Sequence, residues 1–310
     1  MPEPRTLVRH GRLVRIGAAV AVLLALVGYV VVQYVFGGRA APRCTVVSGN
    51  GDGASYELGA DQAQNAATVA AVGTSRGMTE RAVTIALATA LQESGLRNVG
   101  RGDRDSLGLF QQRPSQGWGN AEQIMDPAYS AARFYVHLKE IPGYSRLPLT
   151  VAAQRVQRSG FPQAYAKHEP DAVLLTAALD GRAPATFTCE GRSAEEPGDP
   201  AKVRAALVRD FGRAVAPTRG RGGTLTVPVE ATAASAEGGA GQRGWELAHW
   251  AVAQASTLGI ERVSYGGREW SAANPGKEWR MPGKAGKTGA GGQLGGAGTG
   301  TDEVRIVLGQ

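Results

Sequence analysis

A glutamate near the end of an apolar helix, followed by a loop rich in glycine and glutamine, is the feature of this chain best suited to acid catalysis. Residues 91–95 read LQESG, and residues 102–112 read GDRDSLGLFQQ. Glu93 lies beside the apolar side of a helix that is expected to start after Thr79 and to end at Gly95. A carboxyl group at such a place can donate a proton to a bound substrate. The common alternative is a glutamate that is merely solvated in a last helical turn.

Together these two segments resemble the superfamily of soluble lytic transglycosylases and goose-type lysozymes. The pattern of that superfamily is Glu-Ser near a helix end and then Ser-x-Gly-Leu-x-Gln. Glu93 and Ser94 match the first half, residues 106–111 match the second, and the resemblance covers roughly residues 60–180. It implies that Glu93 is the catalytic acid. It also implies that Asp103, in a Gly-Asp-Arg stretch typical of the goose-type branch, assists the chemistry.

The same resemblance implies a carbohydrate-binding cleft around the glutamate. Sugars are bound by amide hydrogen bonds and by stacking on aromatic faces. The candidate substrate-binding residues are Ser106, Gln111, Gln112, Trp118 and Tyr165. The alternatives are a packing role for the tryptophan and loop-forming roles for the glutamines. The superfamily also has a third motif, whose tyrosine supports the catalytic glutamate; residues 156–160 occupy that place without a tyrosine, and Tyr165 is the residue that would replace it.

The outcome of the reaction depends on a second acidic residue. Goose-type lysozymes use two acidic residues to place a water, whereas a lytic transglycosylase lets the 6-hydroxyl of muramic acid attack its own anomeric carbon. Asp103 matches the first of the two acidic residues, but Arg113 occupies the place of the second. The resemblance therefore favours the lytic reaction over hydrolysis.

Composition and charge narrow the function further. The 310 residues are 43% hydrophobic, which is enough to build a core, and the formal net charge is +7. The basic residues are spread along the chain, and no nucleic-acid-binding motif is present. We therefore expect no nucleic-acid partner and attribute the positive charge to a membrane and an anionic cell wall.

An apolar stretch near the N-terminus predicts a single transmembrane helix over residues 16–36. Arg5, Arg9, Arg12 and Arg15 precede it, so the positive-inside rule places the N-terminus in the cytoplasm. This pattern predicts a single-pass protein of the cell membrane with the bulk of the chain outside the cytoplasm. The alternative is a signal peptide that is cleaved during export.

The two cysteines agree with an oxidising compartment. Cys44 lies before the lysozyme-like region and Cys189 just beyond it, so a disulfide between them would join the two ends of that region. The alternative is a pair of free thiols. Neither cysteine has a second Cys or His at metal-ligand spacing, and His137 and His168 are expected to be surface or core residues. We therefore expect no metal and no cofactor.

The predicted fold class is a mainly α lysozyme-like domain after the single N-terminal transmembrane helix, with a small α+β domain at the C-terminus. Helices are expected near residues 61–73, 80–94, 126–139, 151–158, 164–178, 201–211 and 245–258, and paired strands at 262–265 and 303–307. The expected segments are a cytoplasmic tail (1–15), the transmembrane helix (16–36), a tether with a first strand (37–59), the lysozyme-like domain (60–190), a linker with one helix (191–241) and the C-terminal domain with a disordered Gly-rich loop (242–310).

The C-terminal domain resembles the C-terminal module of secreted bacterial proteins related to zinc-dependent D-alanyl-D-alanine carboxypeptidases. The resemblance rests on a Trp-rich helix and on Tyr265, Arg268, Trp270 and Trp279. Active relatives bring metal-binding histidine and aspartate to the final strand, but His249 is the only histidine of this domain. The resemblance therefore implies a module without its metal ligands, with a role in binding the cell wall.

These patterns lead to one main expectation of function. We expect a membrane-anchored, extracytoplasmic enzyme that cleaves the β-1,4 bond between N-acetylmuramic acid and N-acetylglucosamine in peptidoglycan. The main alternative is a catalytically inactive peptidoglycan-binding or scaffolding protein that kept the fold. A transporter is disfavoured because one span cannot form a translocation path. The expected partners are glycan strands and the membrane, and protein partners are unknown.

Overall fold

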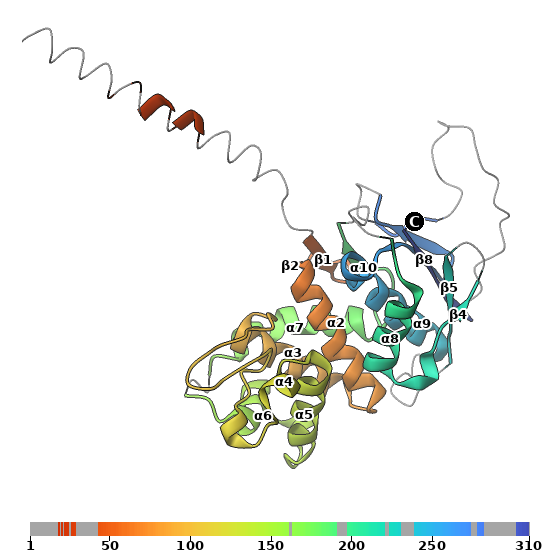
Figure 1. Ribbon diagram of the computed structural model, residues 1–310. Helices are drawn as coiled ribbons and strands as arrows, with labels where there is room; N and C mark the ends of the chain where they lie inside the picture. Colours follow the sequence, from red (N-terminus) through yellow and green to blue (C-terminus); the bar gives the residue numbers. More distant parts are fainter. Residues whose placement is uncertain are drawn as a thin grey trace, which may run out of the picture. The chain divides into compact units, whose positions relative to one another are not determined.

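Helices and two antiparallel sheets make up the part of the chain that the structure, a computed structural model, describes (Figure 1). The described residues are 43–160, 163–190, 197–220, 223–230, 239–273, 278–281 and 302–309, with eight more between positions 18 and 28. The α-helices are α2 (Ala60–Ser75), α3 (Glu80–Ser94), α4 (Ala121–Ile124), α5 (Pro127–Lys139), α6 (Leu149–Gln157), α7 (Glu169–Leu179), α8 (Pro200–Phe211), α9 (Gly239–Ala253) and α10 (Ala255–Leu258). Short 3-10 helices are η1 (Pro114–Gln116), η2 (Tyr144–Arg146), η3 (Ala166–His168) and η4 (Arg213–Val215). The strands are β1 (Arg43–Val47), β2 (Ser55–Gly59), β3 (Phe187–Cys189), β4 (Thr218–Arg219), β5 (Thr224–Pro228), β6 (Ile260–Tyr265), β7 (Arg268–Ser271) and β8 (Glu303–Leu308).

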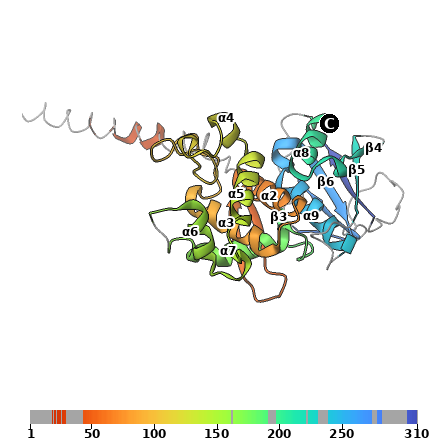
Figure 2. The ribbon, with the colours of Figure 1, turned by 90° about the horizontal axis from the view of Figure 1, so that it is seen from below.

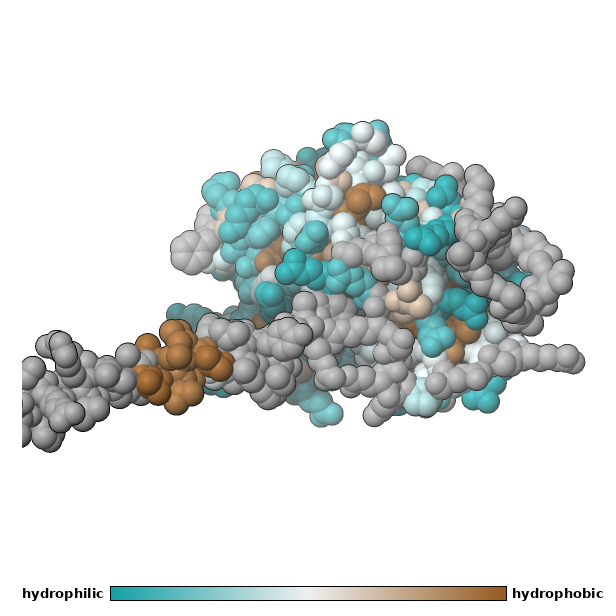
Figure 3. Space-filling view, turned by 90° about the horizontal axis from the view of Figure 1, so that it is seen from above, coloured by the Kyte–Doolittle hydropathy of each residue, from teal (hydrophilic) through white to brown (hydrophobic). Residues whose placement is uncertain are grey.

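The N-terminal unit, Met1–Ala41, is separate from the rest of the chain. Its described residues are helical, and Figure 3 shows them as hydrophobic. Within the described residues, no helix is both long enough and apolar enough to cross a bilayer. This finding overturns the predicted fold class, which began with a transmembrane helix over residues 16–36. Most of that segment, the tail at 1–15 and the Gly-rich loop of the C-terminal domain lie outside the described residues.

The region predicted as a mainly α domain with one first strand contains a three-stranded antiparallel sheet. The strand order is β2-β1-β3, so the start of the domain pairs with its end. Cys44 and Cys189 face each other across β1 and β3 and form a disulfide bond. The first strand was expected, but β3 has only three residues, too few for an alternating pattern to predict it.

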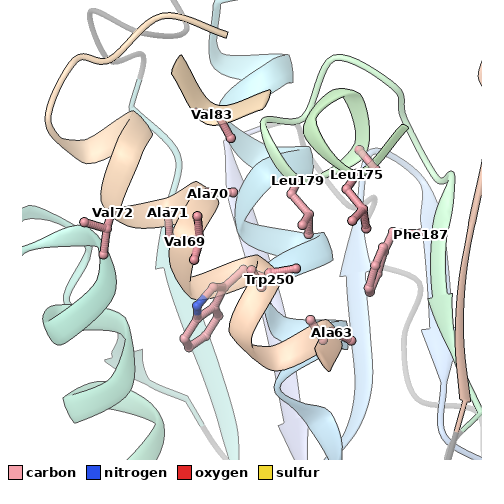
Figure 4. Packing of buried hydrophobic residues seen from close by; sticks show 14 of the residues in the cluster. Ala63, Val69, Ala70, Ala71, Val72, Val83, Leu175, Leu179, Phe187 and Trp250 are labelled. Carbon is pink, nitrogen blue, oxygen red and sulfur yellow. The ribbon is translucent and has the colours of Figure 1, made fainter. Parts of the chain in front are cut away.

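Helix α2 lies at the centre of residues 42–310, between the α3–α7 region on one side and α8, α9 and the second sheet on the other (Figures 1 and 2). It packs against α3, α5, α7, α8 and α9. Alanine makes up much of its buried surface, and small side chains let several helices approach its axis closely. Figure 4 shows Ala63, Ala70 and Ala71 within this packing, together with Leu179 and Trp250 from α7 and α9.

The second sheet has the strand order β4-β5-β8-β6-β7, and α9 packs against β6 and β8. The predicted pairing of residues 262–265 with 303–307 is confirmed by the antiparallel register of β6 and β8, in which Val263 is opposite Ile306. Residues 224–228 were expected to belong to a linker. They form β5 instead, which pairs with β4 and β8 and buries Leu225 and Val227.

Buried polar contacts join this sheet region to α2 and to the first sheet. Asp210 of α8 is buried and accepts hydrogen bonds from Thr68 Oγ1 (3.0 Å) and Trp250 Nε1 (2.8 Å). The indole Nε1 atoms of Trp270 and Trp279 donate to the carbonyl oxygens of Cys189 (3.2 Å) and Phe187 (2.9 Å), on the outer side of β3. These indoles take the place that a further strand would occupy, which protects a sheet edge.

Candidate active site

The end of α3 is fixed by side chains of α2. The helix begins after Thr79, which accepts a hydrogen bond from the Ala82 amide (3.3 Å), and ends at Gly95 in the left-handed conformation (φ 62°, ψ 37°). Both limits agree with the prediction. Gln62 Nε2 then donates to the Gly95 carbonyl (2.7 Å), and Asn65 Nδ2 donates to the Leu96 carbonyl (2.8 Å). The last turn of α3, which carries Glu93, therefore has a defined position.

The loop after this helix is held against it by Ser94. The Ser94 hydroxyl donates to the Leu109 carbonyl (2.8 Å), which joins the two halves of the sequence motif. Leu107 and Gln112 pair as an antiparallel bridge, so residues 107–112 form a tight hairpin. Gly108 has φ +74°, and a Cβ atom there would lie 2.7 Å from the Ile124 carbonyl oxygen, so only glycine fits.

Glu93 shares a short hydrogen bond with Tyr165. The Tyr165 hydroxyl donates to Glu93 Oε1 at 2.6 Å, although the two residues are 72 positions apart. The Tyr165 ring is fully buried, whereas Glu93 is partly exposed. Burial and then the bond to Glu93 raise the pKa of Tyr165, and a hydrogen bond with the Ser159 side chain acts in the opposite direction. The phenol is therefore a stable hydrogen-bond donor to the carboxylate.

Glu93 lines a cleft of about 800 Å³. The predicted site residues that also line it are Asp103, Ser106, Gln111, Gln112 and Trp118. Tyr165 is the predicted residue that does not line the cleft, because it is buried behind Glu93. The structure therefore brings the predicted catalytic and substrate-binding residues to one place.

The polar lining of the cleft suits a ligand rich in hydroxyl and amide groups. Gln111 is partly exposed, and its Nε2 donates to the Gly108 carbonyl (3.1 Å). Gln112 is buried, and its Nε2 donates to the Ser130 carbonyl (3.0 Å), which supports a loop-forming role. Trp118 is partly exposed, and its ring meets His137 edge-on with centroids 4.4 Å apart. An indole braced in this way provides an apolar face for a sugar ring.

The two carboxylates of the Gly-Asp-Arg-Asp stretch are in different situations. The Asp103 side chain is 94% exposed, and Arg104 Nε is 3.9 Å from it. Asp105 accepts from the Ser115 amide (2.9 Å) and from Arg113 Nε (2.6 Å), and these bonds hold its pKa well below the usual value. Arg113 therefore neutralises a neighbouring carboxylate of the loop.

Several cleft residues were not predicted from the sequence. They are Arg104, Arg113, Gln116, His137, Glu140, Ile141 and residues 155–160. His137, for which a surface or core position was expected, lies in the cleft and is 3.4 Å from Glu140. The end of α6 reaches the cleft because α6 packs on α3. The signal in the sequence was that residues 156–160 occupy the place of the third motif of the superfamily. Because that stretch lacks the tyrosine, the arginines at the end of α6 resemble those of an ordinary solvated helix face.

The C-terminal region contains one buried histidine. His249 is fully buried, its Nδ1 is 2.8 Å from the Ala178 carbonyl oxygen, and the rings of Trp245 and Trp279 surround it. Burial lowers the pKa of His249 to about 4. Over the described residues, no three His, Cys, Asp or Glu side chains are grouped so as to hold a metal ion.

Comparison with known proteins concerns the C-terminal region alone. The family model described as VldE, C-terminal domain, matches residues 219–290. No curated protein matches the chain. The matched segment includes β5, α9, α10, β6 and β7 but none of the cleft residues. It covers a minority of the chain and is not the carboxypeptidase-related family that was expected from the sequence. The cleft must therefore be interpreted from its own geometry.

Proposed function

We propose that the protein cleaves the β-1,4 bond between N-acetylmuramic acid and N-acetylglucosamine in peptidoglycan, with Glu93 as the general acid. The observation that carries this proposal is the 2.6 Å hydrogen bond from Tyr165 to Glu93 Oε1 at the wall of the polar cleft. This contact supplies the tyrosine support that residues 156–160 lack. The hydrogen bond between Tyr165 and Glu93 also supports the proposal that residues 60–190 have a lysozyme-like fold.

In the proposed reaction Glu93 acts twice. Its free carboxyl oxygen, Oε2, gives a proton to the glycosidic oxygen as the bond from that oxygen to the anomeric carbon breaks. The 6-hydroxyl oxygen of the muramic acid then bonds to the same carbon, and its proton returns to Glu93. Tyr165 holds Oε1 throughout, which orients Oε2 toward the substrate.

The lytic route is favoured over hydrolysis. A hydrolase with two carboxylates needs the second one at a fixed position, where it attacks the substrate or holds a water. Asp103 is 94% exposed and lies on a loop, and the place of the other acidic residue belongs to Arg113, which binds Asp105. Glu93 alone suffices when the attacking hydroxyl belongs to the substrate.

The disulfide supports a location outside the cytoplasm. Disulfides persist in oxidising compartments and are rare in the cytosol. The bond between Cys44 and Cys189 joins the paired strands β1 and β3. We propose that residues 43–310 act on the outer side of the membrane, where peptidoglycan is found.

The deciding experiment compares wild-type protein with Glu93→Gln on purified peptidoglycan. Glutamine keeps the size of the side chain but cannot donate and retrieve a proton, so turnover should fall by a factor of at least about 100. Mass spectrometry should find 1,6-anhydromuramyl ends; reducing ends that carry oxygen from labelled water would show a hydrolase instead. Equal digestion by both proteins would refute the role of Glu93. Binding without any cleavage by the wild type would favour an inactive wall-binding or scaffolding protein.

A further inference from the structure

Two arginines at the end of α6 face the same cleft as Glu93. Arg155 lies in the last turn of the helix, and Arg158 is its C-terminal cap. Both side chains are exposed, and both line the cleft. They place two positive charges on the wall that α6 contributes.

The backbone at Arg158 is in an unfavourable conformation. Its φ of 51° and ψ of 39° lie in the left-handed region, which glycine adopts without cost and arginine does not. Two hydrogen bonds hold it there, from the Arg158 amide to the Gln154 carbonyl (2.8 Å) and from Gln154 Nε2 to the Ser159 carbonyl (2.7 Å). Strained residues of this kind are concentrated at functional sites. The strain sets the direction in which the Arg158 side chain leaves the helix.

The other charged side chains of the cleft have partners within the protein. These contacts are Arg113 with Asp105 (2.6 Å), His137 with Glu140 (3.4 Å), Arg104 with Asp103 (3.9 Å) and Tyr165 with Glu93 (2.6 Å). Among the residues that the structure describes, no carboxylate forms a salt bridge with Arg155 or Arg158. These two guanidinium groups are therefore available to an anion that enters the cleft.

Arg158 is also close in sequence to the contacts that hold the proposed acid. Its neighbour Ser159 hydrogen-bonds to Tyr165, and Tyr165 donates to Glu93. Because Arg158 and Glu93 line the same cleft, an anion bound by Arg158 would share that cleft with the bond that Glu93 is proposed to cleave. Arginine suits a carboxylate in particular, because its planar guanidinium group can donate two parallel hydrogen bonds.

We propose that Arg158, together with Arg155, binds a carboxylate of the substrate beside the scissile bond. This inference rests on the proposed function, because N-acetylmuramic acid carries a lactyl carboxyl group that N-acetylglucosamine lacks. The carboxylate has two sources. It is the lactyl group itself where no peptide is attached, or a carboxylate of the stem peptide where one is. In either case the arginines select muramyl glycans over neutral chitin-type glycans.

Binding to the full chain carrying Glu93→Gln tests this inference without requiring turnover. Calorimetric titration should compare three probes: a disaccharide with a free lactyl carboxylate, muramyl dipeptide and neutral chitotetraose. Adding Arg158→Gln should weaken binding of at least one carboxylate probe by about 10-fold or more and leave chitotetraose unchanged. The probe that loses more affinity identifies the source of the carboxylate. High salt should weaken the carboxylate probes alone. Arg146→Gln, at an exposed arginine outside the cleft, is the matched control.

Several results would overturn the inference. They are unchanged affinity for both carboxylate probes in Arg158→Gln, equal loss for the neutral probe, or no binding of either carboxylate probe before the arginine is replaced. A separate assay, digestion of peptidoglycan by the wild-type protein, tests the proposed function. Arginine-dependent binding without digestion would refute the enzyme and keep the carboxylate site.

Discussion

Replacing Tyr165 by phenylalanine removes one hydroxyl group and leaves the buried ring in place. The Tyr165 ring is fully buried, so phenylalanine fills the same space without a cavity. The hydroxyl that is lost donates to Glu93 Oε1 at 2.6 Å. The substitution therefore tests whether the position of the proposed acid depends on this contact.

The expected loss follows from the charge of the acceptor. A hydrogen bond to an ionised group contributes about 1.5 to 3 kcal/mol. If that energy is lost from the transition state, the rate falls by a factor of about 10 to 150, since each 1.36 kcal/mol is a factor of ten. The effect on folding should be smaller, about 1 kcal/mol or less, because water in the cleft can solvate the partly exposed Glu93.

The assay measures kcat on peptidoglycan together with the free energy of unfolding in denaturant. Tyr135→Phe is the matched control. The Tyr135 ring is also buried, and its hydroxyl donates to the Val69 carbonyl at 2.9 Å in the packing between α5 and α2. That substitution should lower stability by about 1 kcal/mol and leave kcat within about twofold of wild type.

The reasoning is refuted if Tyr165→Phe keeps wild-type kcat in a protein in which Glu93→Gln abolishes turnover. In that case the acid would be positioned by the rest of α3 alone. A parallel loss of kcat in both tyrosine variants would also refute it, because the effect would then follow stability and not the contact with Glu93.

Two further predictions concern stability. The disulfide between Cys44 and Cys189 closes a loop with a sequence separation of 145, so Cys44→Ser should destabilise the protein by about 4 to 5 kcal/mol in the chain-entropy model, measured by denaturant unfolding; a loss below about 1 kcal/mol would contradict it. Burial lowers the pKa of His249 to about 4 from an ordinary value near 6.5, so the unfolded chain binds a proton first as the pH falls. The stability from the neutral imidazole is complete above pH 6.5 and is lost between about pH 6.5 and 4, by roughly 3 kcal/mol in total. The stability difference between wild type and His249→Gln should shift by that amount between pH 7 and pH 4, and a constant difference would show that His249 titrates normally.

Local signals predicted much of the helical structure correctly. Thr79 and Gly95 mark the limits of α3, and Asp126 caps α5 by accepting from the Ala128 amide at 2.8 Å. These features depend on side chains within a few residues of the backbone groups they satisfy, so a single sequence records them. The same locality explains why Glu93 could be placed near a helix end that precedes a loop.

Contacts between distant segments were harder to predict. Strand β5 was expected to be linker because Gly and Thr dominate its surroundings, yet β8 pairs with it from the other end of the module. Nothing local in the sequence predicts that Asp210 is buried and accepts hydrogen bonds from Thr68 and Trp250. In both cases the decisive partner is far away in the sequence. The position of the α6 arginines could not be predicted for the same reason, since nothing local to Arg158 indicates that it lines the same cleft as Glu93.

Helix α2 connects the C-terminal module with the proposed active site. Thr74 hydrogen-bonds to the buried Glu246 of α9, which also pairs with Arg243 at 2.6 Å. About three turns earlier on the same helix, Gln62 and Asn65 donate hydrogen bonds to the carbonyl groups of Gly95 and Leu96, just after Glu93. A buried carboxylate must keep its partners to remain charged inside a protein, so the contacts of Glu246 fix α9 relative to α2. The described residues of the module do not line the cleft, but these contacts link them through α2 to the last turn of α3.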